Sequence, residues 1–139
     1  MKTERIERVR AALRAQGLTQ MIVCDPKSVW YLTGVAVEPY ERLLALYLPI
    51  EGEPVLFLNS LFNVPNPPCK AVWHTDTDAP VAQIAATVDA EKPLGIDKEW
   101  PAKFLIPLME AHPAMKVVLA SDCVDDCRAC KDAEEQSLM

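Results

Sequence analysis

Three cysteines near the end of the chain have a spacing that could hold a metal centre. Cys123, Cys127 and Cys130 follow the pattern C-x3-C-x2-C, and three thiolates at this spacing can ligate three irons of an iron–sulfur cluster. A zinc site would need a fourth ligand from elsewhere in the chain. The candidates for that ligand are Cys24, Cys69 and His74. Because the neighbouring aspartates would repel an anionic cluster, packing of the cysteines as small apolar side chains is the favoured interpretation.

A loop in the first third of the chain carries an aromatic and a basic side chain two residues apart. Tyr40 and Arg42 lie between a helical segment that ends at Gly34 and an apolar strand that begins at Leu43. Loops at the ends of strands are where a sheet presents side chains to ligands. Arg42 could bind a carboxylate through two hydrogen bonds, and Tyr40 could stack on a substrate. The alternative is an arginine that is only solvated at a strand start.

The sequence contains no other recognisable catalytic pattern. No G-x-S-x-G motif occurs, and the four glycines form no phosphate-binding loop. His74 and His112 are far apart in the sequence, and we expect both to be structural. The acids Asp76 and Asp78 are better explained by helix capping or solvation than by acid–base chemistry.

The elements that would position these side chains alternate between strands and helices. Strands are predicted at residues 21–24, 43–48, 55–58, 94–96 and 115–119, with a short edge strand considered at 72–74. Helices are predicted from Thr3 to a stop at Gly17, over residues 27–32, after an N-cap at Asp78, and from Pro101, where Pro107 should kink or split the helix. The pattern predicts an α/β fold with a mixed five-stranded sheet flanked by helices.

Composition narrows the class of protein. The 139 residues match one domain, and the net charge of −6 without a basic cluster argues against nucleic acid and anionic membranes as partners. No apolar run approaches the roughly 18 residues of a membrane-spanning helix, and the charged N-terminus lacks the apolar core of a signal peptide. Five cysteines in such a chain indicate reduced thiols. We therefore expect a soluble, cytoplasmic protein.

The end of the chain looks like the start of an interrupted helix. Asp132 can cap the first amides, and Glu135 can reach back to complete a capping box. Only a few residues follow, and so short a helix cannot stand alone, because nucleation costs more than its few hydrogen bonds return. We expect residues 1–131 to form one domain and residues 132–139 to begin a linker helix into a further domain.

Two segments resemble the creatinase/prolidase N-terminal domain. Residues 28–34, which read SVWYLTG, resemble its N-I-x-Y-L-T-G segment, and residues 128–136 resemble its R-x-I-K-x-x-x-E junction with the catalytic domain. The order of the predicted elements between them also fits. Trp30 departs from the pattern, since a smaller or basic residue is usual there. Cys130 replaces the usual isoleucine, which favours the packing interpretation of the cysteines.

This resemblance implies a ribonuclease-H-like sheet topology and a parent enzyme similar to the pita-bread metallopeptidases that cleave the bond before proline. It implies two divalent metal ions (Mn, Co or Zn), held by a C-terminal catalytic domain that this chain lacks, and no catalytic residue or metal ligand here. It also implies a homodimer in which this domain leans over the neighbouring subunit's active site. By this resemblance Tyr40 and Arg42 match substrate-contacting positions of creatinase-like members, and Trp73 is a weaker candidate.

The sequence is therefore consistent with three functions. The leading one is the non-catalytic N-terminal domain of an Xaa-Pro aminopeptidase or dipeptidase, which assists substrate selection and dimerisation on proline-containing peptides but is inactive alone. The second is the same domain of a creatinase-type amidinohydrolase. The third, from a different class, is a small zinc- or iron–sulfur-binding module using Cys123, Cys127 and Cys130.

Overall fold

The computed structural model describes residues 1–129 of the chain. The helices are α1 (Thr3–Ala15), α2 (Pro26–Thr33), α3 (Pro80–Thr87), α4 (Ala102–Ala111) and α5 (Asp122–Ala129). The strands are β1 (Gln20–Val23), β2 (Ala45–Pro49), β3 (Val55–Asn59), β4 (Lys70–His74), β5 (Leu94–Ile96) and β6 (Val117–Leu119). The predicted linker helix at residues 132–139, the boundary at residue 131 and Cys130 lie outside the described residues.

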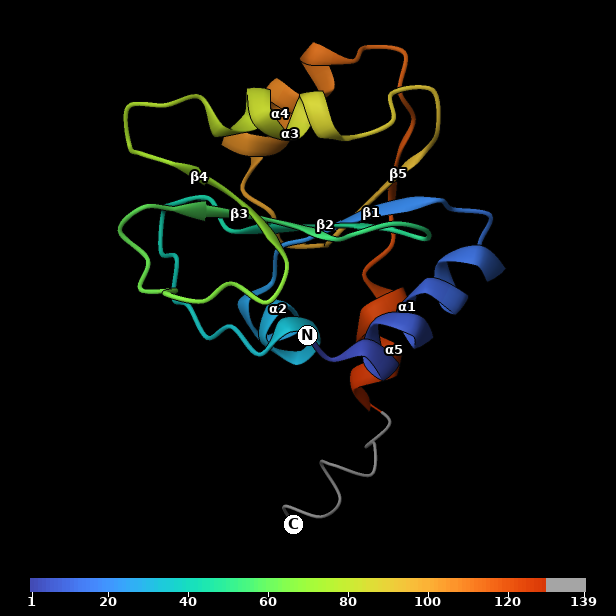
Figure 1. The fold of residues 1–139 in the computed structure, drawn as a ribbon. Coiled ribbons are helices and arrows are strands. Elements are labelled where there is room, and N and C mark those ends of the chain that lie inside the picture. Colours follow the sequence, from blue (N-terminus) through green and yellow to red (C-terminus); the bar gives the residue numbers. More distant parts are fainter. Residues whose placement is uncertain (130–139) are drawn as a thin grey trace.

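The strands form one mixed sheet in the order β4-β3-β2-β1-β5-β6 (Figure 1). Strands β1, β2 and β3 are consecutive and antiparallel, whereas β5 and β6 join β1 in parallel. This confirms the mixed sheet flanked by helices. The sheet has six strands rather than five, because the short edge segment considered at residues 72–74 extends over Lys70–His74 and pairs in parallel with all of β3.

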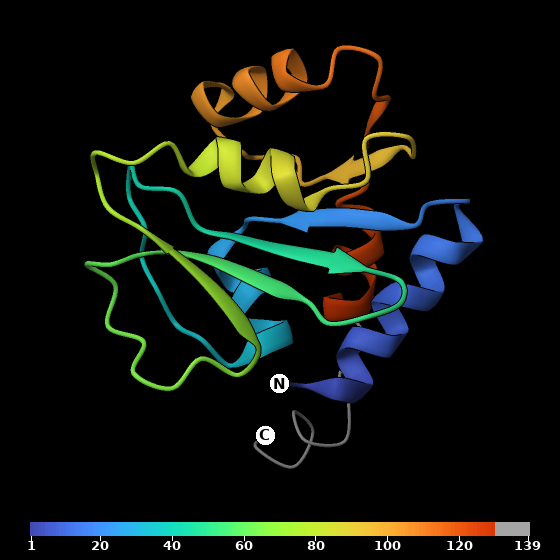
Figure 2. The ribbon, with the colours of Figure 1, turned by 45° about the horizontal axis from the view of Figure 1, so that its top comes forward.

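Helices cover both faces of the sheet, as Figures 1 and 2 show. Helices α1, α2 and α5 lie on one face, and α3 and α4 lie on the other. The side chains of β2 alternate between two apolar cores, with Leu46 packed on the α1 side and Tyr47 on the α3 side. The prediction of a central strand buried on both faces is therefore confirmed.

The helix starts differ from the predicted ones. Thr3 is the first residue of α1 and not its cap, and no side chain caps that helix. Helix α3 begins at Pro80 after Ala79, because the Asp78 carboxylate instead accepts a hydrogen bond from the backbone amide of Thr75 at 2.7 Å. Helix α4 runs through Pro107 as one element, so the proline does not split it.

Helix α5 was not predicted and closes the α1 face of the sheet. Its first turn is acidic, as a helix N-terminus favours. Two side-chain contacts join α5 to α2 and to Asp25, the residue before α2. Nη1 of Arg128 lies 3.1 Å from Oδ2 of Asp25, and the Tyr31 hydroxyl donates to the carbonyl of Cys127 at 3.1 Å. Through the same nitrogen, Arg128 also bonds the hydroxyl of Ser28. Within residues 1–129, no helix is long and apolar enough to cross a membrane.

Candidate functional site

A tight turn sets the position of the loop between α2 and β2. Helix α2 ends at Gly34, which takes a left-handed conformation with φ of 81°. Further on, the amide of Arg42 donates to the carbonyl of Pro39 at 2.9 Å, and Tyr40 inside this turn has a φ of 52°. A non-glycine residue in the left-handed region carries backbone strain, which is often found at ligand-binding loops. The turn exposes the Tyr40 ring almost completely, at 84%.

The Arg42 side chain is held by Asp76, which follows β4. Nε of Arg42 lies 3.1 Å from Oδ1 of Asp76, and Nη2 lies 3.2 Å from Oδ2. These two hydrogen bonds raise the pKa of Arg42, and the same pairing lowers the pKa of the Asp76 carboxyl. Both groups are therefore ionised at neutral pH. The sequence alone favoured capping or solvation for Asp76, so this partner is new.

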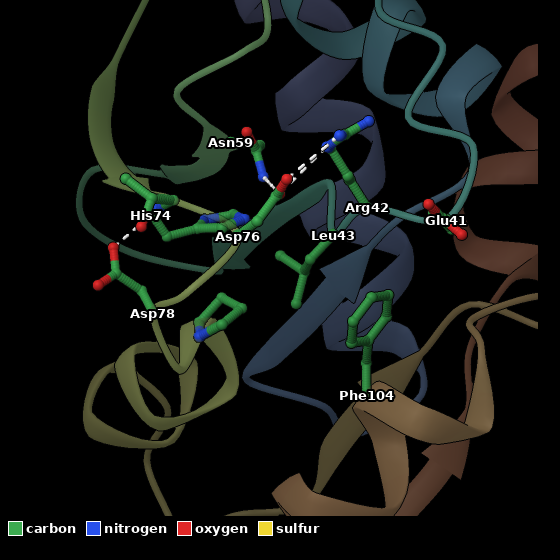
Figure 3. A pocket seen from close by; sticks show the side chains of 10 residues that line it. Glu41, Arg42, Leu43, Asn59, His74, Asp76, Asp78 and Phe104 are labelled. Carbon is green, nitrogen blue, oxygen red and sulfur yellow. Dashed lines mark hydrogen bonds and ion pairs between the residues drawn. The ribbon is translucent and has the colours of Figure 1, made fainter.

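A buried asparagine fixes the carboxylate in turn. Asn59, at the end of β3, is only 2% exposed and donates from Nδ2 to Oδ1 of Asp76 at 2.8 Å. Its own Oδ1 accepts the backbone amide of Leu61 at 2.9 Å, which fixes the orientation of the amide group. This bond to Asn59 is the second cause of the lowered pKa of Asp76. Figure 3 shows the chain of contacts from Asn59 through Asp76 to Arg42.

His74 completes the polar side of this site. It stands opposite Asn59 in the register of β3 and β4 and is 3% exposed. Its Nδ1 is buried and has no hydrogen-bond partner among residues 1–129. Burial lowers the pKa of His74, although the nearby Asp78 and Asp76 oppose that shift. The imidazole is therefore neutral near pH 7, in keeping with the structural role expected for it.

These residues line an open pocket of about 390 Å³, which we call the Arg42 pocket. Its polar wall contains Arg42, Asp76, Asn59, His74 and Asp78, and its apolar side is formed by Leu43, Pro80 and Phe104 (Figure 3). The pocket is lined by three carboxylates, those of Glu41, Asp76 and Asp78, and by one cation, the guanidinium of Arg42. The arrangement suits hydrogen bonding and side-chain binding, and it lacks a nucleophile paired with a base.

A second, smaller pocket of about 220 Å³ adjoins the same arginine. It is lined by Tyr40 and Arg42 from the loop, by Trp100 from the segment before α4 and by Phe104 from the first turn of α4. The Trp100 and Phe104 rings lie 6.1 Å apart, a normal distance for a packed aromatic pair. Tyr40 and Arg42, the two leading predicted site residues, are therefore brought to one pocket by the fold.

Trp73, the third predicted site residue, is not brought to either pocket. In β4 successive side chains alternate between the faces of the sheet. His74 and Val72 face α3 and α4, so Trp73 and Ala71 face the opposite side. Trp73 is 40% exposed there. Its predicted contact with a substrate in a neighbouring subunit stays a prediction.

The cysteines considered as metal ligands lie on both faces of the sheet. Cys123 is 1% exposed within the apolar core on the α1 face, and Cys127 packs partly against the same core. Cys24 belongs to the core on the other face of the sheet. The sheet thus separates Cys24 from Cys123, which supports the packing interpretation of Cys123. Among residues 1–129, no cluster of three or more histidine, cysteine or acidic side chains has a geometry that could hold a metal ion.

Sequence reasoning missed Asn59 and Asp76, and the available signal for them was weak. Asn59 is the last residue of β3, and Asp76 lies two positions after the last residue of β4. The carboxyl ends of parallel neighbouring strands meet at one edge of a sheet. Only the parallel pairing of β3 with β4 brings the two residues together, and that pairing was not predicted.

Comparisons with known proteins agree with this architecture. A family model for the Creatinase/Prolidase N-terminal domain matches residues 5–130. An uncharacterized peptidase of Staphylococcus epidermidis is 30% identical over 87 residues, which are 60% of this chain and 25% of that protein. This chain thus spans about a quarter of the length of that relative.

Two crystal structures have the same fold. Dipeptidase PepE from Mycobacterium ulcerans superposes with a TM-score of 0.81 at 26% identity, covering 98% of this chain and 38% of that one. The Creatinase/Prolidase N-terminal domain of an X-Pro dipeptidase from Streptococcus pyogenes superposes with a TM-score of 0.75 at 20% identity. There the alignment covers 91% of this chain and 99% of that chain, so the described fold matches a whole domain.

Proposed function

This chain belongs to the Creatinase/Prolidase N-terminal domain family, and from that membership we propose that it is the non-catalytic N-terminal domain of a proline-specific (Xaa-Pro) metallopeptidase. The observation that carries a substrate-related role is the fixed guanidinium of Arg42 beside the strained Tyr40 turn. A cation held in place at an open pocket suits binding of a peptide carboxylate or carbonyl. The proposal assigns substrate selection, and not bond cleavage, to this domain.

Substrate contact in the proposal is made across a homodimer. The exposed Tyr40 ring and the accessible Arg42 edge would reach the active site of the neighbouring subunit, where Tyr40 stacks on the peptide and Arg42 binds its oxygen atoms. Trp73 would make its contact from the opposite face of the sheet, as part of a separate region of the interface. The support is the common pocket of Tyr40 and Arg42 together with the exposure of Tyr40.

Hydrolysis in the proposal belongs to a C-terminal catalytic domain that carries two divalent metal ions (Mn, Co or Zn). The residues described here do not fit such a centre, because no metal-holding cluster occurs among them. In the proposal, the metal-dependent step therefore takes place outside this domain. The cytoplasm is the proposed compartment, supported by the free thiols of Cys24, Cys69 and Cys123.

The test compares the full-length gene product with the 139-residue chain. Both are assayed with Mn²⁺ on Ala-Pro, Ala-Ala and creatine, and their masses in solution are measured by sedimentation. The proposal predicts a dimeric full-length enzyme that cleaves Ala-Pro in preference to Ala-Ala, and an inactive isolated chain. Hydrolysis of creatine with no cleavage of Ala-Pro would establish the creatinase-type alternative. Turnover of Ala-Pro by the isolated chain would contradict the non-catalytic role.

A further inference from the structure

The Arg42 guanidinium uses only one of its edges within this domain. Asp76 takes the hydrogens on Nε and on one side of Nη2, whereas a guanidinium has five N–H donors in a rigid plane. Within residues 1–129, Nη1 makes no hydrogen bond or ion pair. The end edge, formed by Nη1 and the remaining hydrogen of Nη2, is therefore open to a second acceptor. Two parallel donors on that edge match a carboxylate.

The side edge is held by a carboxylate that has a second hydrogen-bond partner. Asp76 is fixed by Nδ2 of Asn59, and Asn59 is buried and fixed by the amide of Leu61. Unlike a solvated arginine, Arg42 is thereby restricted in side-chain rotation before any ligand arrives. Its backbone is restricted as well, through the turn closed on Pro39. Ordering a binding group in advance improves affinity, because less entropy is lost when the ligand binds.

We propose that Asp76, held by Asn59, is a positioning residue that orients Arg42 so that the open end edge of its guanidinium faces the peptide substrate. Asp76 itself does not touch the substrate. Its negative charge also keeps the side edge of the Arg42 guanidinium paired when no substrate is bound. This inference rests on the proposed function, because it needs Arg42 to contact the substrate.

The Asp76 carboxylate does not block the edge of the Arg42 guanidinium that the substrate would use. A carboxylate on the side edge and one on the end edge can bind a single guanidinium together, since they use different hydrogens. Asn59 supplies a compensating donor to Asp76. The pair therefore prepares the binding edge and does not compete for it.

The test is a double-mutant cycle in the full-length enzyme, assayed on Ala-Pro. Asp76→Ala is expected to raise KM about two- to fivefold with kcat little changed, the range that a partly exposed ion pair can supply. The same substitution in an Arg42→Ala background should have no further effect, because nothing remains to be oriented. Asp76→Asn, which keeps one acceptor for the guanidinium, should restore part of the lost affinity. Asp125→Ala is the matched control, since it removes another partly exposed ion pair, that with Lys98, and neither residue lines either pocket.

The outcomes separate this inference from the proposed function. A large effect of Arg42→Ala with no effect of Asp76→Ala would overturn the positioning role and leave the proposed function intact. Additive effects of the two substitutions would also overturn it. No effect of Arg42→Ala would remove the substrate role of Arg42 and the positioning role together. A second measurement, ¹⁵N relaxation of the Arg42 Nε–H group, reports the order of the side chain without substrate. This group should be ordered in the wild type and mobile in Asp76→Ala. Equal mobility in both would contradict the inference.

Discussion

Arg42 and Asp76 are separated by 34 positions in the sequence and meet through two hydrogen bonds of 3.1 and 3.2 Å. The loop before β2 and the segment after β4 are joined by this pair. Because both side chains are at the surface, the pair is expected to matter more for the geometry of the site than for the stability of the fold.

Replacement of Arg42 should therefore affect kinetics and spare folding. Arg42→Ala in the full-length enzyme is expected to lower kcat/KM at least about tenfold, the effect of losing hydrogen bonds from a charged group. Arg42→Lys should be intermediate, because lysine cannot offer two parallel donors. The urea midpoint of unfolding should stay close to that of the wild type. A large drop in that midpoint would show instead that Arg42 is a structural residue.

His74 should make stability depend on pH. Burial lowers its pKa in the folded chain below the ordinary value of 6.5. At pH values between the lowered pKa of the folded chain and 6.5, His74 of the unfolded chain binds a proton that His74 of the folded chain does not. Stability therefore falls as the pH is lowered through about 6.5. Urea unfolding at pH 7.5 and 5.5 measures this loss. In His74→Gln the difference between the two pH values should shrink.

The other histidine provides the control for that measurement. His112→Gln removes a hydrogen bond with the carbonyl of Ala85, so it should lower stability at both pH values while keeping the pH-dependent loss due to His74. If stability depends on pH as strongly in His74→Gln as in the wild type, the buried neutral imidazole is not the cause of that dependence.

Gly95 in β5 should tolerate no side chain. A Cβ placed there would lie 2.7 Å from the Cβ of Ala120, which is 1% exposed and has little room to move. Gly95→Ala is expected to cost about 1–3 kcal/mol of unfolding free energy through overpacking. The double variant with Ala120→Gly should lose less unfolding free energy than the sum of the losses in the two single variants, because the clashing Cβ of Ala120 is removed. Strict additivity in chemical denaturation would contradict the clash.

The cysteines should behave as packing residues toward alkylating reagents. Burial is the main cause of the raised pKa of Cys24 and Cys123, and it raises the pKa of Cys69 to about 11. Since the thiolate is the reactive form, these three thiols should react slowly with iodoacetamide at pH 8 and rapidly in urea. Mass spectrometry of the labelled peptides measures each site.

The metal-module alternative makes the opposite prediction for the same chain. If Cys123, Cys127 and Cys130 formed a zinc site, the metal would bind stoichiometrically and protect Cys127 from alkylation. We expect zinc to be removed by desalting and to leave the labelling pattern unchanged. Retention of about one zinc per chain, lost in Cys127→Ser, would favour the metal module over the packing interpretation.

The sequence was most informative where a signal is local. The apolar run from Leu43 to Leu48 predicts a strand buried on both faces, and β2 has that burial. Gly34 predicts the end of α2, where it takes the left-handed cap conformation. These features depend on residues adjacent in the chain, which is why they could be read without the structure.

The site was less predictable because its contacts are between distant segments. Asp78 has the residue type and position of a helix cap, but its carboxylate binds the amide of Thr75 instead. Asp76 has no local feature that marks it as a partner of Arg42. That contact exists because β4 pairs in parallel with β3 and sets Asn59 opposite His74. Such pairing depends on the whole sheet, and no short pattern encodes it.

The most direct test of the central claim mixes two kinds of full-length subunit. One carries Arg42→Ala with an intact catalytic domain, and the other keeps Arg42 but is inactivated in its catalytic domain. By the proposed function, the intact active site of a mixed dimer would receive the loop of the neighbouring subunit. If that loop contacts substrate across the dimer, the mixed dimers should cleave Ala-Pro with the wild-type KM. If they show only the KM of the Arg42→Ala enzyme, the claim that this domain selects substrate for its neighbour is wrong.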